Sequence, residues 1–279
     1  MSIVWSNLKD RNFHIEVNEG GVKARRYFSM TEESTVSMWI KAREILIGGF
    51  LLVLGGIICF LALAQFRLQP PYWIAWFLFL LSLVTSSAGV IFCRDRQTSK
   101  SLAVFNRPVA RKLAWGSLAF ILVIGLLIRV YNITELPYGL WYDEADNILN
   151  AVEFNKNPGK VSVFSPSTHL PTPFLILIAF VQEGIGYNWI AGRLVAGLFS
   201  LGLIASLYFL GNQLGGVLLG VGSAYLACVL RWSVNWGRIG MHGITAAFFS
   251  ALSAYLLLRA VKNWDLAWFF WAGFAVGIG

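Results

Sequence analysis

ILIGGFLLVLGGIICFLALAQF, residues 45–66, is the stretch that decides the fold class of this protein. It has no charged side chain, and it is long enough to cross a bilayer core about 30 Å thick, which takes about 20 apolar residues in a helix. The runs Tyr72–Cys93 and Leu113–Val130 reach a similar length, and we expect uncharged interiors in all three. Of the 279 residues, 57% are hydrophobic and 13% are charged, whereas a soluble domain has roughly 25% charged residues. We therefore expect an all-α integral membrane protein, not a soluble or disordered chain.

The apolar pattern predicts about seven transmembrane helices. The run Pro173–Val181 is too short to cross, so we assign it to the membrane interface. We divide the chain into a tail (1–44), an extra hairpin with a basic loop (45–112) and a membrane core (113–279) that holds an external loop (131–192). The expected spans are Ile45–Phe66, Tyr72–Cys93, Leu113–Val130, Leu194–Leu210, Val217–Leu230, Gly243–Ala260 and Trp268–Gly279.

The distribution of charge predicts the orientation. The tail 1–44 has seven basic residues and the loop 94–112 has six, whereas segment 131–192 has two lysines and a cluster of acids. Because basic loops are retained in the cytoplasm, we expect a plasma-membrane protein with a cytoplasmic amino terminus and an external loop 131–192. The net charge of +8 is then explained by topology, and no nucleic-acid partner is expected. The acids of the external loop are Glu135, Asp143, Glu144, Asp146, Glu153 and Glu183.

The stretch most indicative of chemistry is Pro137-Tyr-Gly-Leu-Trp-Tyr-Asp-Glu-Ala-Asp146. It places three carboxylates just outside the third span, where an amphipathic helix over 144–155 is expected on the membrane surface. One interpretation makes Asp143 the helix N-cap, with Asp146 completing a capping-box-like pair. The other makes Asp143 a general base that accepts the proton of an incoming hydroxyl or amine, with the adjacent carboxylates tuning its proton affinity. The two roles are compatible.

The pattern Pro-x-Gly-x-x-x-Asp-Glu-Ala after a first core span resembles the polytopic lipid-linked sugar transferases of the GT-C fold. More closely, it is similar to glycosyltransferase family 39, the protein O-mannosyltransferases and their bacterial relatives, with the aminoarabinose transferases as cousins. The resemblance covers about residues 113–279, so the first two spans look like an amino-terminal addition. The family's carboxy-terminal half has no counterpart in this sequence, so we expect either a GT-C-type glycosyltransferase or its membrane-embedded amino-terminal portion.

The resemblance also implies site residues. The candidate catalytic residues are Asp143 and Glu144, and the candidate substrate-binding residues are Tyr142, His169, Arg193, Arg238 and His242. His169 and the prolines after it resemble a family element that opens an interfacial helix, and Arg193 matches an arginine that opens the next span. The arginines could instead snorkel to lipid headgroups. Some relatives hold a metal through an acid where His242 stands, so this sequence gives no support for a metal site and predicts no certain cofactor.

The resemblance implies a membrane glycosyltransferase that uses a sugar on a polyprenyl phosphate. The acceptor would be a protein, a lipid or a glycan, Asp143 would deprotonate it, and the anomeric carbon would be inverted. The alternative is a non-enzymatic membrane protein, such as a transporter or a scaffold subunit, or an inactive fragment. Transporters often consist of two repeated halves. This sequence shows no internal repeat, and its acids cluster in one loop, which favours the transferase.

Overall fold

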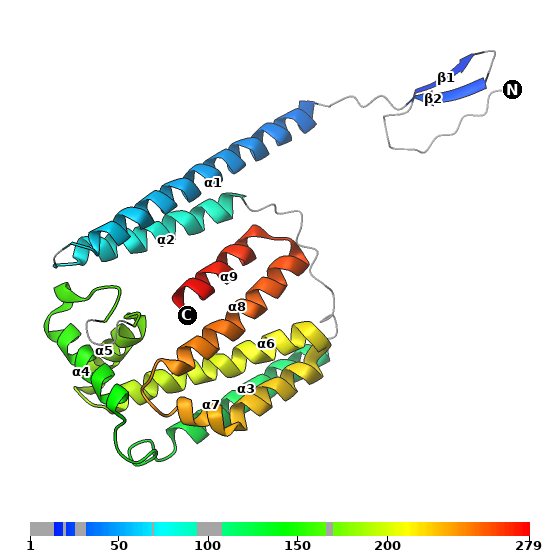
Figure 1. Cartoon of the computed structure of the whole chain (residues 1–279). Coiled ribbons are helices and arrows are strands. Elements are labelled where there is room, and N and C mark those ends of the chain that lie inside the picture. Colours follow the sequence, from blue (N-terminus) through cyan, green and yellow to red (C-terminus); the bar gives the residue numbers. More distant parts are fainter. Residues whose placement is uncertain (1–13, 19–20, 26–31, 69, 94–107, 166–169) are drawn as a thin grey trace. The chain divides into compact units, whose positions relative to one another are not determined.

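The computed structural model describes residues 14–18, 21–25, 32–68, 70–93, 108–165 and 170–279 (Figure 1). His169, part of the predicted tail 1–44 and most of the predicted basic loop 94–112 lie outside these residues. Contacts between residues divide the chain into two units, residues 1–47 and residues 48–279.

The first unit contains a β-hairpin that the all-α prediction does not include. Strand β1 (His14–Asn18) pairs antiparallel with β2 (Gly21–Arg25), and Val17 lies opposite Val22 in the register. Apolar and polar residues alternate along β1, as expected for a strand with two different faces. The helical prediction therefore applies to the rest of the described chain, which contains the apolar helices.

Among the described residues, five helices are long and apolar enough to cross a membrane, and the prediction of a multi-pass membrane protein is confirmed at this level. They are α1 (Glu32–Gln65), α2 (Trp73–Cys93), α3 (Pro108–Val130), α6 (Ile190–Val229) and α8 (Gly243–Asn263). Two of the seven predicted spans fall within α6, and the last falls within α9 (Leu266–Ile278), which is shorter than a span. The finer count of seven remains a prediction.

The predicted hairpin of the first two spans is confirmed by the way α1 and α2 pack. A Cβ atom placed on Gly89 would lie 2.8 Å from the carbonyl oxygen of Gly48, and one placed on Gly55 would meet Ser86. These contacts run in opposite directions along the two helices, so the helices are antiparallel. Small residues allow the two backbones to approach closely, as is common between helices in membranes.

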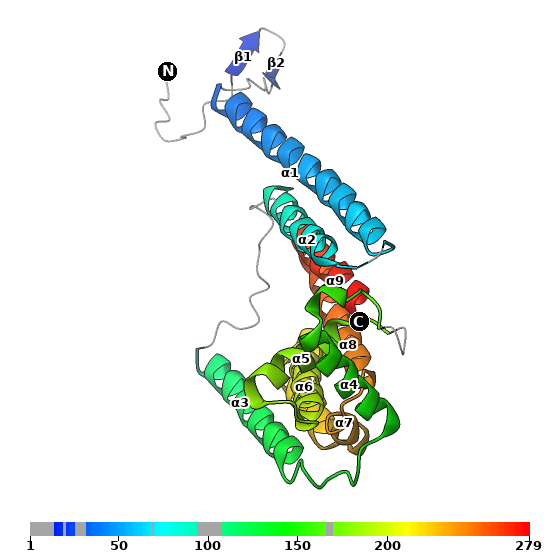
Figure 2. The same cartoon turned by 90° about the vertical axis from the view of Figure 1, so that its left-hand side faces the viewer.

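Helix α6 folds back on itself at Gly215 and Gly216, whose backbone angles are not helical. Gly216 has a φ of 81°, which glycine adopts without steric cost. The two arms of α6 lie side by side next to α3 in both views (Figures 1 and 2), and a Cβ atom on Gly211 would lie 3.1 Å from the Cα of Gly220. The chain therefore turns between the predicted spans Leu194–Leu210 and Val217–Leu230.

Between α3 and α6 the chain forms the elements of the predicted external loop. They are α4 (Tyr142–Lys156), the short 3₁₀ helix Pro158–Lys160 and α5 (Pro173–Ile185), which covers the run assigned to the interface. The expected helix over 144–155 is confirmed, and it packs against α5 through Ile148, Ala151 and Phe154. The short helix α7 (Arg231–Trp236) then leads from α6 toward α8.

Candidate functional site

The site is organised around the first turn of α4. Trp141, not Asp143, precedes the helix as its N-cap residue, and the side chain that reaches back to it belongs to Glu144. The Glu144 carboxylate accepts a hydrogen bond from the backbone N–H of Trp141, at 3.4 Å. The expectation that Asp143 caps the helix with Asp146 is therefore wrong. The carboxylate that caps the helix sits one position later, where it faces the protein interior.

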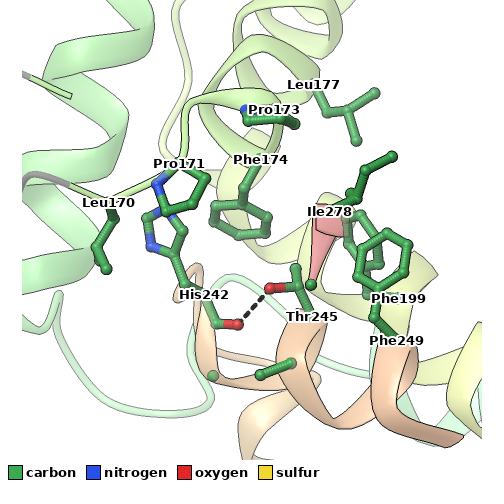
Figure 3. A pocket seen from close by; sticks show the side chains of 13 residues that line it. Leu170, Pro171, Pro173, Phe174, Leu177, Phe199, His242, Thr245, Phe249 and Ile278 are labelled. Carbon is green, nitrogen blue, oxygen red and sulfur yellow. Dashed lines mark hydrogen bonds between the residues drawn. The ribbon is translucent and has the colours of Figure 1, made fainter. Parts of the chain in front are cut away.

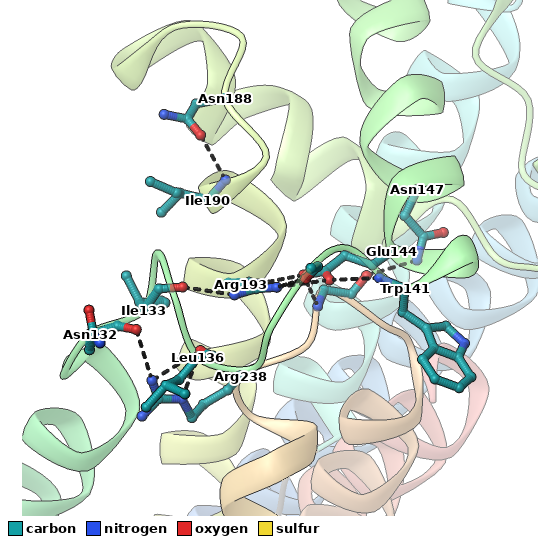
Figure 4. A network of polar contacts seen from close by, with 12 residues as sticks. Asn132, Ile133, Leu136, Trp141, Glu144, Asn147, Asn188, Ile190, Arg193 and Arg238 are labelled. Atoms are coloured by element: carbon teal, nitrogen blue, oxygen red, sulfur yellow. Dashed lines mark hydrogen bonds and ion pairs between the residues drawn. The ribbon is translucent and has the colours of Figure 1, made fainter.

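Glu144 is 1% exposed and forms an ion pair with Arg193, whose side chain is 0% exposed (Figure 4). The Nε of Arg193 lies 2.8 Å from Oε1 of Glu144, and the guanidinium also donates to the carbonyl oxygens of Ile133 and Gly139. Arg193 comes from the start of α6, whereas these carbonyls belong to the segment before α4. The pair therefore joins the segment before α4 to the start of α6.

Glu144 also fixes the segment before α8. The backbone N–H of Gly240 donates to Oε1 of Glu144 at 3.0 Å, and its carbonyl accepts a hydrogen bond from the Asn147 side chain at 2.9 Å. A Cβ atom on Gly240 would lie 3.1 Å from backbone atoms of Gly192, so this close approach requires glycine. Because His242 follows two residues later, α4 determines where His242 lies.

Arg238 is buried, and its hydrogen bonds go to backbone carbonyl groups. Its Nη1 donates to the carbonyl of Ile128 at 2.6 Å. Its Nη2 donates to the carbonyl of Leu136 at 3.0 Å (Figure 4). Burial, and next the positive charge of Arg193, lower the pKa of Arg238 below its usual range. The guanidinium groups of Arg193 and Arg238 thus bind the loop that follows α3. Because both side chains are buried, they do not snorkel to headgroups, and their predicted contact with a phosphate stays a prediction.

A third buried arginine, Arg129, corrects the expectation of uncharged span interiors. It lies in the last turn of α3, and its Nε donates to Ser200 at 2.7 Å and its Nη2 to Ser233 at 2.9 Å. Its Nη1 also reaches the carbonyl of Cys228 at 3.3 Å. The signal in the sequence is the cation itself, because an ionisable residue within an apolar run is expected to find polar partners inside the bundle.

Asp143 differs from its two neighbouring carboxylates. Asp146 accepts a hydrogen bond from Asn150 at 3.1 Å, and Glu144 is fully engaged. Asp143 is half-buried, and its carboxylate makes no hydrogen bond or ion pair with any residue in the described ranges. Tyr142, beside it, is 82% exposed. The arrangement leaves one carboxylate of the three able to accept a proton or a hydrogen bond from an incoming group.

His242 lies at the N-terminus of α8 (Figure 3). The charge of Asp143 acts on its ring. Its ring packs on Phe174, with 4.7 Å between the ring centroids, and the carbonyl of Pro171 accepts a hydrogen bond from it. Burial lowers the pKa of His242 below its ordinary value of 6.5, although the Pro171 carbonyl and the Asp143 carboxylate act in the opposite direction. The imidazole is therefore neutral at pH 7 and is held in place from two sides.

A cavity of about 340 Å³ opens beside His242 (Figure 3). Its walls are almost entirely apolar and come from α5, α6, α8 and α9, with Pro171 and Leu170 at the edge. Five of the candidate residues predicted from the sequence lie close together in the structure: Asp143, Glu144, Arg193, Arg238 and His242. The cavity was not predicted, because Phe174, Phe199 and Phe249 look like ordinary core residues in the sequence.

Among the described residues, no group of three or more His, Cys, Asp or Glu side chains lies close enough together to hold a metal ion. His169 is outside those residues, so its predicted role stays a prediction. Comparison with protein-family models, with curated proteins and with solved structures gives no match for this chain.

Proposed function

We propose that the chain is a membrane glycosyltransferase that moves a sugar from a polyprenyl phosphate to an acceptor on the external face, with Asp143 as the general base. The observation that carries this proposal is the contrast among the three carboxylates of α4. Asp143 alone of the three makes no hydrogen bond or ion pair with another described residue, and it lies at the rigid start of a helix, within electrostatic range of His242, which lines the cavity. A general base needs this combination of access and fixed position.

The chemistry follows from that position. The acceptor oxygen or nitrogen attacks the anomeric carbon of the donor sugar, and the bond from that carbon to the phosphate oxygen breaks. The proton of the acceptor passes to the Asp143 carboxylate, and the lipid phosphate leaves with the electron pair. Attack from the side opposite the leaving group inverts the anomeric carbon.

The other candidate residues have different roles in this step. Glu144 and Arg193 hold the start of α4, so we assign them to positioning Asp143. Arg193 and Arg238 put two positive charges beneath the external segment, which favours a leaving phosphate through the local electrostatic potential. Arg231 is exposed at the start of α7, and it is the better candidate for a direct contact with the phosphate.

The test is sugar transfer by the full chain carrying Asp143→Asn. A general base contributes about 10²- to 10⁴-fold to a rate, so transfer from a polyprenyl-phosphate hexose should fall at least about 100-fold. Asp146→Asn is the matched control, since it removes the same charge three residues along the same helix and should retain most of the activity. Equal activity in the two variants, at equal expression, contradicts the assignment.

A further inference from the structure

A polar group beside the apolar cavity, the His242 imidazole, indicates which kind of ligand the cavity binds. The Nε2 atom of His242 is buried and has no hydrogen-bond partner among the described residues. A buried polar atom without a partner is costly, because it has lost its hydrogen bond with water and gained nothing in return. A bound ligand with a suitable group at this point removes that cost.

The chemistry of the imidazole decides which group is suitable. With one ring nitrogen donating to the Pro171 carbonyl, Nε2 of the neutral ring offers a lone pair and accepts a hydrogen bond. The nearby Asp143 carboxylate is also an acceptor and carries negative charge. A hydroxyl or an amine can donate to either group, whereas a phosphate presents mainly acceptor oxygens at neutral pH and is repelled by the charge of Asp143.

The cavity walls define the rest of the ligand. Phe199, Phe249 and Leu177 line the space away from His242, and its volume of about 340 Å³ lies at the lower end of the range of roughly 300–1,000 Å³ for ligand sites. An aliphatic or aromatic body fits these walls, because it gains from leaving water and needs no hydrogen bond within the cavity.

We propose that this cavity binds an amphiphilic alcohol or amine, with its apolar body between α5, α6 and α8 and its hydroxyl or amino group at His242 and Asp143. If the chain is a transferase, this ligand is the acceptor and not the lipid-phosphate donor. The identification as acceptor rests on the proposed function, whereas the binding itself does not.

The experiment measures binding without any transfer reaction. The full chain in phosphatidylcholine nanodiscs is irradiated with dodecanol that carries a diazirine at the end of its chain, and labelled residues are located by mass spectrometry. Dodecyl phosphate with the same diazirine is the comparison probe. We expect saturable labelling of α5 and α8 residues that line the cavity by the alcohol, and at least about fivefold weaker labelling by the phosphate at neutral pH.

Two variants separate the cavity from the imidazole. Ala246→Phe fills the cavity and leaves His242 unchanged, so labelling by the alcohol should be lost. His242→Leu keeps an apolar wall and removes the acceptor, so alcohol binding should weaken about 2- to 10-fold, as expected for one net hydrogen bond. Preference for the phosphate, or alcohol labelling that neither variant reduces, overturns the proposal. The Asp143→Asn transfer assay is independent of these results, so either proposal can fail without the other.

Discussion

Glu144 and Arg193 form a buried ion pair across 49 residues of sequence, with 2.8 Å between Oε1 and Nε. The pair joins the first turn of α4 to the first turn of α6, and Glu144 extends it to Gly240. An ion pair this deep in the protein needs hydrogen bonds at every side, because its loss of hydration offsets much of the attraction between the charges. The surrounding backbone carbonyl and N–H groups provide them.

Removing one partner of this pair should destabilise the protein strongly. Glu144→Ala leaves the Arg193 guanidinium buried without its counter-charge, and breaking a buried pair in this way costs about 3–5 kcal/mol. The midpoint of thermal unfolding in detergent should fall accordingly. Glu153→Ala is the control, because it removes an exposed carboxylate from the same helix and should change the midpoint little. Similar midpoints for the two variants contradict the role assigned to Glu144.

Arg129 should not tolerate replacement by lysine. Its guanidinium reaches Ser200, Ser233 and the carbonyl of Cys228 at once, and a lysine ammonium cannot follow that planar geometry. At least one buried group then loses its partner, which costs about 1–3 kcal/mol. Arg67→Lys makes the same chemical change at an exposed position and serves as control in the same unfolding measurement. If both variants unfold at the wild-type midpoint, the network around Arg129 contributes nothing.

His242 should make the protein sensitive to acid. Its pKa is lowered in the folded state, so the folded protein binds fewer protons than the unfolded chain below the ordinary value of 6.5. Stability from neutral His242 is therefore complete above that value and is lost as the pH falls from about 6.5 toward the lowered pKa. The Asp143 carboxylate, on α4, raises the pKa of His242 and so opposes this lowering. Asp143→Asn should therefore lower the pKa of His242 further and increase the loss of stability at acid pH.

The measurement is the unfolding midpoint of wild type and of His242→Gln between about pH 8 and about pH 5. The difference between the two should be constant in the upper part of this range and should change in favour of the variant in the lower part. Parallel pH profiles for the two proteins show that His242 does not titrate in the way its surroundings predict.

Features that depend on neighbouring residues could be predicted from the sequence, whereas contacts between distant residues could not. Apolar run length located α2, α3 and α8 within a few residues, because a membrane span is a local property of composition. The partner of Arg193 is 49 residues away, and a single sequence carries no signal for a contact of that kind. Asp143 and Glu144 are adjacent acids at the start of one helix, so their sequence alone does not show which of the two caps it.

The β-hairpin and Arg129 were missed for other reasons. Apolar and polar residues alternate along β1, and the sequence Glu19-Gly20-Gly21 after it is typical of a hairpin. The prediction for residues 1–44 rests on their basic charge alone and includes no hairpin. The expectation of an uncharged interior for Leu113–Val130 overlooks Arg129, which stands one residue before the end of that run. Its burial depends on Ser200 and Ser233, which α6 and α7 bring from 71 and 104 residues away.

The orientation proposed from the charges can be tested with the structure as a guide. Lys160 is exposed beside α4, and Lys262 is exposed near the end of α8, where its ammonium donates to the carbonyl of Gln213 next to the α6 turn. In a background that lacks Cys59, Cys93 and Cys228, Lys160→Cys should react with a membrane-impermeant maleimide added to intact cells. Lys262→Cys should react only after the membrane is opened, because the two positions belong to opposite ends of the bundle if α8 crosses once. Protection of Lys160→Cys in intact cells, together with labelling of Lys262→Cys, would invert the proposed topology and place the candidate site on the cytoplasmic face.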